Sequence, residues 1–351
     1  MKVSQATRQR TENLRREYKA EYSQYERAVH TLLAFSFAVT WDPSSSRVRG
    51  GTAVYQGLKM FDPAGRERTP DLVIRLDKNS GVVAELKKSL PKNKGLWAAI
   101  FEQIEGYCRP LSGWDKPAKE KVSHAVAALF PFDFKDDVAE FLEVRKASGK
   151  LAIDVTCGAF AFFLEARPKD FWTFELFWTE ERTGRFPGSM KRITSVPFAR
   201  LMLAYGGEVK FIDDKPPLLF LAQVIWDNIF SSIPSEEEYR ANRGGVIEFP
   251  ITPVELTKRL NLIYSFSSIL HKYGKDPINP PQPPQAIRKE WVVDVLNFLK
   301  KHKLAEETDP GKAYKILFKK LRPNTLDHLI TCMASDSVTT SNLQETLPLE
   351  S

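Results

Sequence analysis

Two carboxylates and a lysine form the arrangement with the clearest chemical potential in this sequence. Asp71 begins the apolar segment DLVIRL, and Glu85 and Lys87 lie two residues apart in VVAELKKSL. Residues two apart in a β-strand lie on the same face of the sheet. The polar segment between them, residues 77–81 (DKNSG), suits a hairpin turn that would bring Asp71 back beside the other two. We therefore expect the three side chains to converge at the edge of a sheet.

This set of groups suits the hydrolysis of a phosphodiester bond. The scissile phosphate is anionic and repels hydroxide, so a hard divalent cation is needed to neutralise it and to activate a water. Mg²⁺ prefers carboxylate, carbonyl and water oxygens. Asp71, Glu85 and the backbone carbonyl of Leu86 would supply such ligands, with Mn²⁺ as a substitute metal. Lys87 would then orient the attacking water and stabilise the developing charge.

The alternative is an ordinary solvated hairpin, because an Asp and a Glu-X-Lys pair also occur together by chance. The segments that contain Asp71 and Glu85 are apolar, however, which draws the Glu85 carboxylate toward the core. A buried carboxylate needs a partner or a metal ion. The sequence therefore favours an active site over a surface hairpin.

Pro70-Asp71 followed by Glu85-Leu86-Lys87 resembles the PD-(D/E)XK motif of restriction-type nucleases and their relatives. The resemblance covers about the first 170 to 200 residues of the chain. It implies a restriction-endonuclease-like α/β (α+β) fold, in which a mixed sheet is flanked by helices. It also implies a metal-dependent nuclease, since members of this superfamily cut DNA, branched DNA and RNA.

Three further residues resemble positions of the same superfamily. Gln103 and Tyr107, in FEQIEGYCRPL, match the QxxxY signature that many members carry on the helix after the third strand. They are four residues apart, so both project from one helical face, although ordinary packing is the alternative. Members also often place a glutamate of the first helix near the metal. Glu26 is the candidate here and Glu21 the second choice, while a solvent-facing charge is the alternative; His30 is expected to be structural.

A basic loop follows the Glu-X-Lys pair. Lys88, Lys92 and Lys94 form the densest positive segment near the expected site. Beside a phosphodiester site they would contact the nucleic-acid backbone and make binding strongly salt-dependent. The alternative is a solvated loop without a ligand.

Hydrophobic periodicity predicts a mixed α/β domain over residues 1–205. We expect a long first helix, three strands, a helix, a strand, a second helix and two more strands. These elements are predicted at residues 11–37, 52–61, 71–76, 82–90, 96–108, 122–132, 136–150, 159–166 and 171–182.

The rest of the chain predicts a mostly helical, winged-helix-like domain over residues 206–334, followed by a disordered tail over residues 335–351. The expected helices lie within residues 216–233, 249–270 and 287–304, and a hairpin lies within residues 306–321. Thr252 would cap the second helix, with Pro253 at its first position. A proline-rich insertion, DPINPPQPPQ, departs from the short turn of a DNA-binding helix pair. The domain would therefore serve either nucleic-acid recognition or protein interaction.

Composition limits the kind of metal site, the class of binding partner and the cellular compartment that we expect. The three cysteines and five histidines are scattered, which argues against a disulfide framework and against a thiolate or imidazole metal site. A net charge of +7 permits binding to a polyanion. No apolar run approaches the roughly 20 residues that span a bilayer, and the charged N-terminus is unlike a secretory signal. We therefore expect a protein without membrane contact that stays in the cytoplasm, or in the nucleus if the source cell has one.

The sequence as a whole predicts a Mg²⁺-dependent endonuclease, with DNA favoured over RNA. A role in restriction or phage defence fits this architecture by analogy. One alternative is a non-catalytic DNA-binding regulator whose nuclease-like domain is a scaffold. Another is a nuclease subunit controlled by a protein partner docked on the C-terminal domain. A homodimer would suit cleavage of both strands of a duplex.

Overall fold

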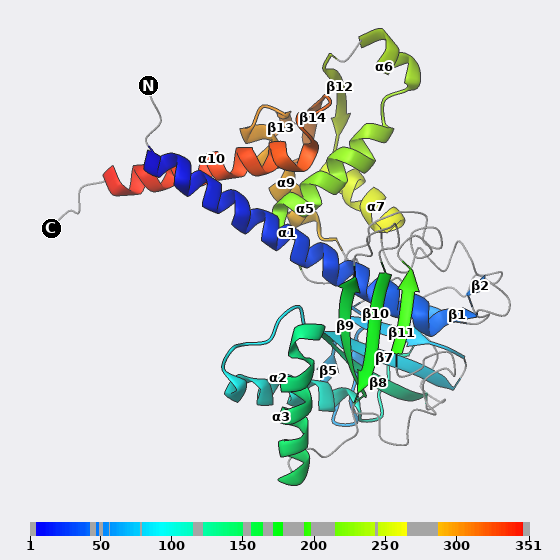
Figure 1. Cartoon of the computed structure of the whole chain (residues 1–351). Coiled ribbons are helices and arrows are strands. Elements are labelled where there is room, and N and C mark those ends of the chain that lie inside the picture. The colour runs from blue at the N-terminus through cyan, green and yellow to red at the C-terminus, as the bar shows by residue number, and fades with distance from the viewer. Residues whose placement is uncertain are drawn as a thin grey trace. The chain divides into compact units, whose positions relative to one another are not determined.

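The computed structural model of the chain (Figure 1) places most of the predicted elements. It describes residues 5–42, 47–48, 52–55, 57–77, 79–114, 122–149, 156–163, 171–177, 193–197, 215–242, 245–264 and 287–346. The proline-rich insertion at residues 276–285 and the last five residues of the predicted tail lie outside these ranges.

The chain divides into two compact units. One consists of Ala28–Asp214 and Tyr264–Ala286 and is called the sheet unit here. The other consists of Met1–Arg27, Lys215–Ile263 and Ile287–Ser351 and is called the terminal unit. The boundary at Lys215 lies close to the one expected at residue 205. The division differs from expectation at the N-terminus, because Met1–Arg27 belongs to the terminal unit.

Aromatic contacts explain why the N-terminus joins the terminal unit. Helix α1 (Gln5–Thr40) is continuous and longer at both ends than its predicted range. In its first part, the rings of Tyr22 and Tyr25 lie 5.2 and 4.7 Å from the ring of Phe220. Arg15 also donates a hydrogen bond of 2.6 Å to Thr331 Oγ1. These partners lie about two and three hundred residues further along the chain, so hydrophobic periodicity alone gave no sign of them.

Seven of the described strands of the sheet unit form one mixed sheet, in the order β11-β10-β9-β8-β7-β6-β3, while β1 (Trp41–Asp42) pairs with β2 (Arg47–Val48) in a separate short hairpin. The pairs β7–β8 and β8–β9 are parallel, and the other pairs are antiparallel. The strands are β3 (Ala53–Tyr55), β6 (Leu72–Arg75), β7 (Ser80–Leu86), β8 (Ser123–Pro131), β9 (Thr156–Phe163), β10 (Phe171–Phe177) and β11 (Ile193–Pro197). The predicted mixed sheet with flanking helices is therefore confirmed.

Two helices cover one face of this sheet. Helix α2 (Trp97–Tyr107) and helix α3 (Lys135–Ala147) follow short 3₁₀ turns at Lys94–Leu96 and Phe132–Phe134. Their apolar side chains share one buried cluster with alternate residues of the strands, as the period of two requires. The cluster includes Val73, Val83, Phe101, Ile104, Tyr107, Val126, Ala128, Phe130, Val138 and Leu142.

The opposite face of the sheet is equally apolar. Its side chains, among them Ile74, Val82 and Leu129, are fully buried. The end of α1, residues 28–40, belongs to the same unit and is itself almost entirely buried. Both faces of the central strands are therefore excluded from water, which is why these strands read as near-continuous apolar runs.

A small hairpin precedes the motif-bearing strands. Strands β4 (Met60–Phe61) and β5 (Glu67–Arg68) pair antiparallel, and the fully buried side chain of Asp62 fastens their loop. Its Oδ1 accepts from the backbone N–H groups of Ala64 and Arg66, and its Oδ2 accepts from the guanidinium groups of Arg66 and Arg68 at 2.8 and 3.2 Å. Burial alone would raise the pKa of Asp62, but these hydrogen bonds outweigh it and lower the pKa to about 2.

The terminal unit combines helices with a three-stranded antiparallel sheet, in the order β12-β14-β13. The predicted helices and the hairpin are present, and Thr252 caps α7 by accepting from the N–H of Glu255 at 3.1 Å, as expected. The elements are α5 (Leu218–Val224), continued by a π turn (Ile225–Ile229) and a 3₁₀ turn (Phe230–Ser232), α6 (Glu236–Asn242), β12 (Ile247–Ile251), α7 (Pro253–Tyr264), α9 (Lys289–Lys301), β13 (Ala305–Asp309), β14 (Ala313–Phe318) and α10 (Thr325–Thr346).

The terminal unit contains helix α6 and the start of helix α10, which we did not predict, and two further features differ from expectation. Residues 335–346, predicted to be disordered, continue helix α10 to Thr346. Residues 247–251 form strand β12 at the edge of the sheet, where we predicted no strand. An edge strand tolerates Pro250, which has no N–H to donate to a sheet ladder.

Replacing Asp62 with asparagine should lower the urea midpoint of unfolding at pH 7. A carboxylate whose pKa is lowered on folding stabilises the protein fully above its unfolded pKa of about 4. This contribution is lost as the pH falls through the folded pKa of about 2. The difference between wild type and D62N should therefore shrink as the pH is lowered across this window. A constant difference would contradict the prediction.

Candidate active site

The hairpin of β6 and β7 stops pairing where the motif begins. The antiparallel register joins Leu72 to Ala84, so the next hydrogen-bonded pair would join Pro70 to Leu86. Proline has no N–H and cannot continue the exchange. The side chain of Asp71 takes over, and its Oδ2 accepts from the backbone N–H of Leu86 at 2.7 Å. Asp71 is thus held against β7, as expected.

The carboxylate of Glu85 is buried, with both oxygens hydrogen-bonded. Glu85 is 5% exposed. Its Oε1 accepts from Lys87 Nζ at 2.7 Å and from Gln103 Nε2 at 3.1 Å. Its Oε2 accepts from the hydroxyl of Tyr107 at 3.1 Å. The structure therefore brings these four predicted residues into one network.

Hydrogen bonds also join the donors to one another. Lys87 Nζ donates to Gln103 Oε1 at 3.3 Å, and Gln103 Nε2 lies 3.1 Å from the Tyr107 hydroxyl. Gln103 and Tyr107 lie one turn apart on α2, the spacing that the QxxxY pattern predicts. Burial, and then the negative charge of Glu85, raise the pKa of Tyr107 above its usual range. The Tyr107 hydroxyl is therefore protonated at neutral pH and donates a hydrogen bond to Glu85.

Two contacts that the sequence did not reveal position α2. The ring of His124, at the start of β8, lies 2.7 Å from the backbone carbonyl of Tyr107 through Nε2. The guanidinium of Arg68 lies against Gly106, where a Cβ atom would approach it to 2.9 Å. A glycine inside a helix costs stability and often marks a close approach of this kind. The glycine at position 106 could therefore have indicated the close approach of Arg68 from the sequence alone. No feature of the sequence indicated the contact of His124.

The C-terminal end of β7 carries carboxylate and carbonyl oxygens, which are the ligands that a hard divalent cation prefers. In an extended strand the N–H and C=O of one residue point to the same side. The carbonyl of Leu86 therefore points to the side from which Asp71 binds its N–H, and the N–H of Lys87 turns the other way to Leu129 O at 2.9 Å. Among the described residues there is no group of three His, Cys, Asp or Glu side chains suited to a metal. A metal here would use two carboxylates, the Leu86 carbonyl and water.

Glu26 is not part of this network. It belongs to the terminal unit, where it is half-buried and shares a hydrogen bond with the hydroxyl of Tyr22 on the same helix. Burial raises the pKa of its carboxyl. Glu21, the second choice, is exposed. The structure thus brings Asp71 and Glu85 together with Gln103 and Tyr107 of α2. The role of Glu26 near the metal stays a prediction. Burial lowers the pKa of His30 to about 4, which fits the neutral structural residue expected there.

The three lysines of the basic loop differ in their surroundings. Lys92 is exposed and Lys88 is half-buried. Lys94 forms ion pairs with Asp137 at 2.9 Å and Glu140 at 3.0 Å on α3. Its hydrogen bonds to these two carboxylates raise its pKa. Lys94 therefore anchors its loop to α3. Lys92 and Lys94 are both exposed, and Lys92 would be the better placed of the two to contact a phosphate.

No protein-family model, curated protein or solved structure matches this chain. Among the helices in the described part of the chain, none is both long and apolar enough to cross a membrane.

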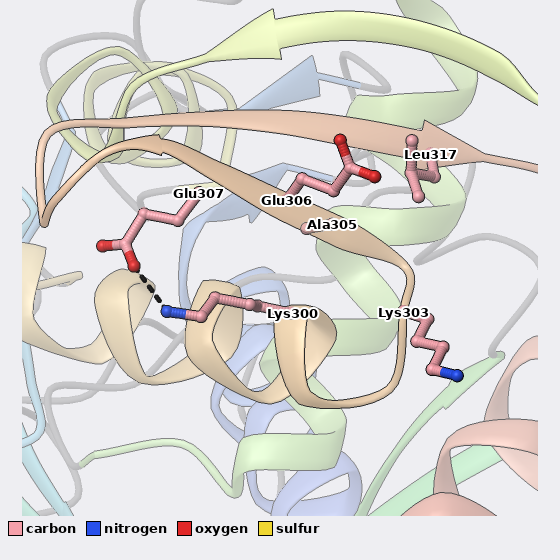
Figure 2. Close-up of a pocket in the computed structure, with 6 residues that line it drawn as sticks. All are labelled: Lys300, Lys303, Ala305, Glu306, Glu307 and Leu317. Carbon is pink, nitrogen blue, oxygen red and sulfur yellow. Dashed lines mark hydrogen bonds and ion pairs between the residues drawn. The ribbon is translucent and has the colours of Figure 1, made fainter.

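The terminal unit carries a separate open groove of about 600 Å³. Figure 2 shows its lining, which comes from the end of α9 and from both strands of the β13–β14 hairpin. Lys300 forms an ion pair with Glu307, whereas the carboxylate of the neighbouring Glu306 points away from this pair (Figure 2) and pairs with Lys315. With cation and carboxylate joined in this way, the groove lacks the converging, desolvated groups that mark the edge of β7.

The Tyr107 hydroxyl should couple energetically to the Glu85 carboxylate. A hydrogen bond to a buried charge contributes about 1.5–3 kcal/mol, so Tyr107→Phe should lower the free energy of unfolding by about this amount. In a double-mutant cycle with Glu85→Gln, urea unfolding should show a coupling of about 1 kcal/mol or more. Strictly additive effects would mean that the two groups do not interact in solution.

Proposed function

We propose that this chain is a divalent-metal-dependent nuclease that hydrolyses phosphodiester bonds, with DNA as the favoured substrate. The observation that carries the proposal is the buried Glu85 carboxylate, which is bound by Lys87, Gln103 and Tyr107 beside the strand edge where Asp71 is held. This is the residue set of the PD-(D/E)XK superfamily with its QxxxY helix, on the mixed sheet that such a nuclease requires. A role in restriction or phage defence is part of the proposal by analogy.

Each residue then has a defined task. Asp71, Glu85 and the Leu86 carbonyl would hold a Mg²⁺ ion, which supplies charge neutralisation of the phosphate and an activated water. Lys87 is the cationic donor at the same edge and would stabilise the charge that develops on the phosphate oxygens. Gln103 donates to Glu85 and accepts from Lys87, so it orients both. Tyr107 fixes the remaining Glu85 oxygen.

The order of elements in the terminal unit supports a winged-helix assignment. Helix α5, the short helix α6, strand β12, helices α7 and α9, and the β13–β14 hairpin occur in this order along the described chain, and without α6 they correspond to helix, strand, two helices and a wing. In such a fold α9 would be the recognition helix and the hairpin the wing. The assignment makes this unit the candidate for choosing the substrate or for binding a regulator.

Charge pairing in the terminal unit favours a protein partner over a phosphate backbone. Lys215 pairs with Asp294 at 2.8 Å, and Lys315 pairs with Glu306 at 2.7 Å and Glu248 at 3.3 Å. Lys300, on α9, pairs with Glu307. Binding to nucleic acid depends on cations that neutralise phosphates and release counterions. Because these lysines already have carboxylate partners, the alternative of a nuclease subunit controlled by a partner docked on this unit gains support.

Cleavage assays test the proposed chemistry. Wild-type protein should cut plasmid, single-stranded DNA or RNA with Mg²⁺ or Mn²⁺, and EDTA should stop it. Asp71→Asn, Glu85→Gln and Lys87→Met should each lower the rate by at least about a hundredfold, because each removes a group that faces the reacting phosphate. Lys146→Met, an exposed lysine of α3, is the matched control and should retain full activity. Cleavage that resists EDTA or survives all three substitutions would refute the site, and tight binding without cleavage would favour a non-catalytic regulator.

Salt dependence of binding should separate Lys92 from Lys94. A lysine that neutralises one phosphate contributes about 0.9 to the slope of log K against log salt concentration. Lys92→Ala should reduce the slope for an uncleavable DNA by about this amount. Lys94→Ala should reduce it less, because Lys94 is already paired with Asp137 and Glu140. Equal reductions would show that Lys94 leaves its carboxylates to bind the nucleic acid.

A further inference from the structure

Lys87 has a contact that its proposed role at the phosphate does not require. Its ammonium lies 2.7 Å from Glu85 Oε1, in an ion pair whose side chains are 20% and 6% exposed. Of the described side chains, Lys87 is the one cation that donates to Glu85. The same carboxylate oxygen also faces Gln103 Nε2 at 3.1 Å. A divalent cation bound by Glu85 would have to share or replace this arrangement.

We propose that Lys87 and the divalent cation compete for Glu85, so that Lys87 is released toward the substrate only when a cation is bound. This inference rests on the proposed function. A buried carboxylate that loses its cation is costly, so Lys87 stabilises Glu85 as long as no other positive charge does. A cation on the same carboxylate removes the need for the ion pair and repels the ammonium at short range. The divalent cation thereby replaces Lys87 as the positively charged partner of Glu85.

Gln103 provides the pivot for this exchange. Its carbonyl oxygen already accepts from Lys87 at 3.3 Å, while its amide nitrogen donates to Glu85. When Lys87 leaves Glu85, the Gln103 oxygen can keep a hydrogen bond to the ammonium, so the lysine stays at the site. Gln103 is exposed at the open side of α2, where a phosphate would approach.

The exchange couples metal binding to substrate binding. A released ammonium is a stronger partner for a phosphate than one already paired with a carboxylate. The metal should therefore raise the affinity for nucleic acid, and nucleic acid should raise the affinity for the metal by the same factor, because binding linkage is reciprocal. Removing Lys87 should remove the share of this coupling that arises from the exchange.

Metal titration without nucleic acid tests the competition directly. Isothermal titration of Mg²⁺ into wild type, Lys87→Met and Lys92→Met should show tighter binding to K87M by about tenfold or more, since the competing charge is gone. The K92M variant removes the same charge from an exposed position of the following loop and should bind within about twofold of wild type. Mg²⁺ should also raise the unfolding temperature of K87M more than that of wild type.

A second measurement uses the unmodified protein, so it does not depend on the folding of a variant. Acylation of lysines by an amine-reactive reagent, read by mass spectrometry, should become several-fold faster at Lys87 when Mg²⁺ is added, and should not change at Lys92.

Three results would overturn the proposal: equal or weaker Mg²⁺ binding by K87M, equal tightening by K92M, or unchanged acylation of Lys87. Cleavage assays distinguish this failure from failure of the proposed function. Active wild-type protein with one of these results refutes the competition alone. Tighter binding of Mg²⁺ by K87M, combined with no cleavage by wild type, refutes the nuclease assignment and leaves the competition standing.

Discussion

The carboxylate of Glu85 is buried on a central strand, where it needs partners. A buried charge without partners would be strongly destabilising, so the fold has to bring donors to it. One donor, Lys87, comes from the same strand face, and two, Gln103 and Tyr107, come from α2. The docking of α2 on this sheet is therefore tied to the chemistry of the site as well as to its apolar cluster, in which Tyr107 also takes part.

Local backbone hydrogen bonding determines the geometry of the rest of the site. Pro70 has no N–H to donate to Leu86, the Asp71 carboxylate accepts from the Leu86 N–H, and the Leu86 carbonyl is left facing the same side. The fastened β4–β5 hairpin leads directly into Pro70, and Arg68 of that hairpin packs on Gly106 of α2. The segments that carry the two halves of the site are thus linked twice, once through Glu85 and once through Arg68.

Features that depend on residue spacing could be predicted from the sequence. Features that depend on contacts between residues far apart in the chain could not. The hairpin, the shared face of Glu85 and Lys87, and the pairing of Gln103 with Tyr107 follow from periods of 2 and 3.6 residues. The division of α1 does not, because it depends on Phe220. Strand β12 was missed because its alternation lasts five residues and includes Pro250. Whether a lysine is free or paired also depends on tertiary neighbours, as Lys94 and α3 show.

Net charge is therefore a poor guide to where this chain would meet a polyanion. The excess of basic residues is +7, yet Lys215, Lys300 and Lys315 of the terminal unit and Lys94 of the sheet unit are paired with carboxylates. Such pairs contribute little to phosphate binding, because the approaching phosphate must compete with the carboxylate already in place. Lys87 is paired as well, but its partner is the residue that a divalent cation would claim. If the proposed function is right, binding of the metal would free the Lys87 ammonium under the same condition that supplies the site with its divalent cation. The ion pair at Glu85 would then make the charge that is available to a phosphate depend on the metal.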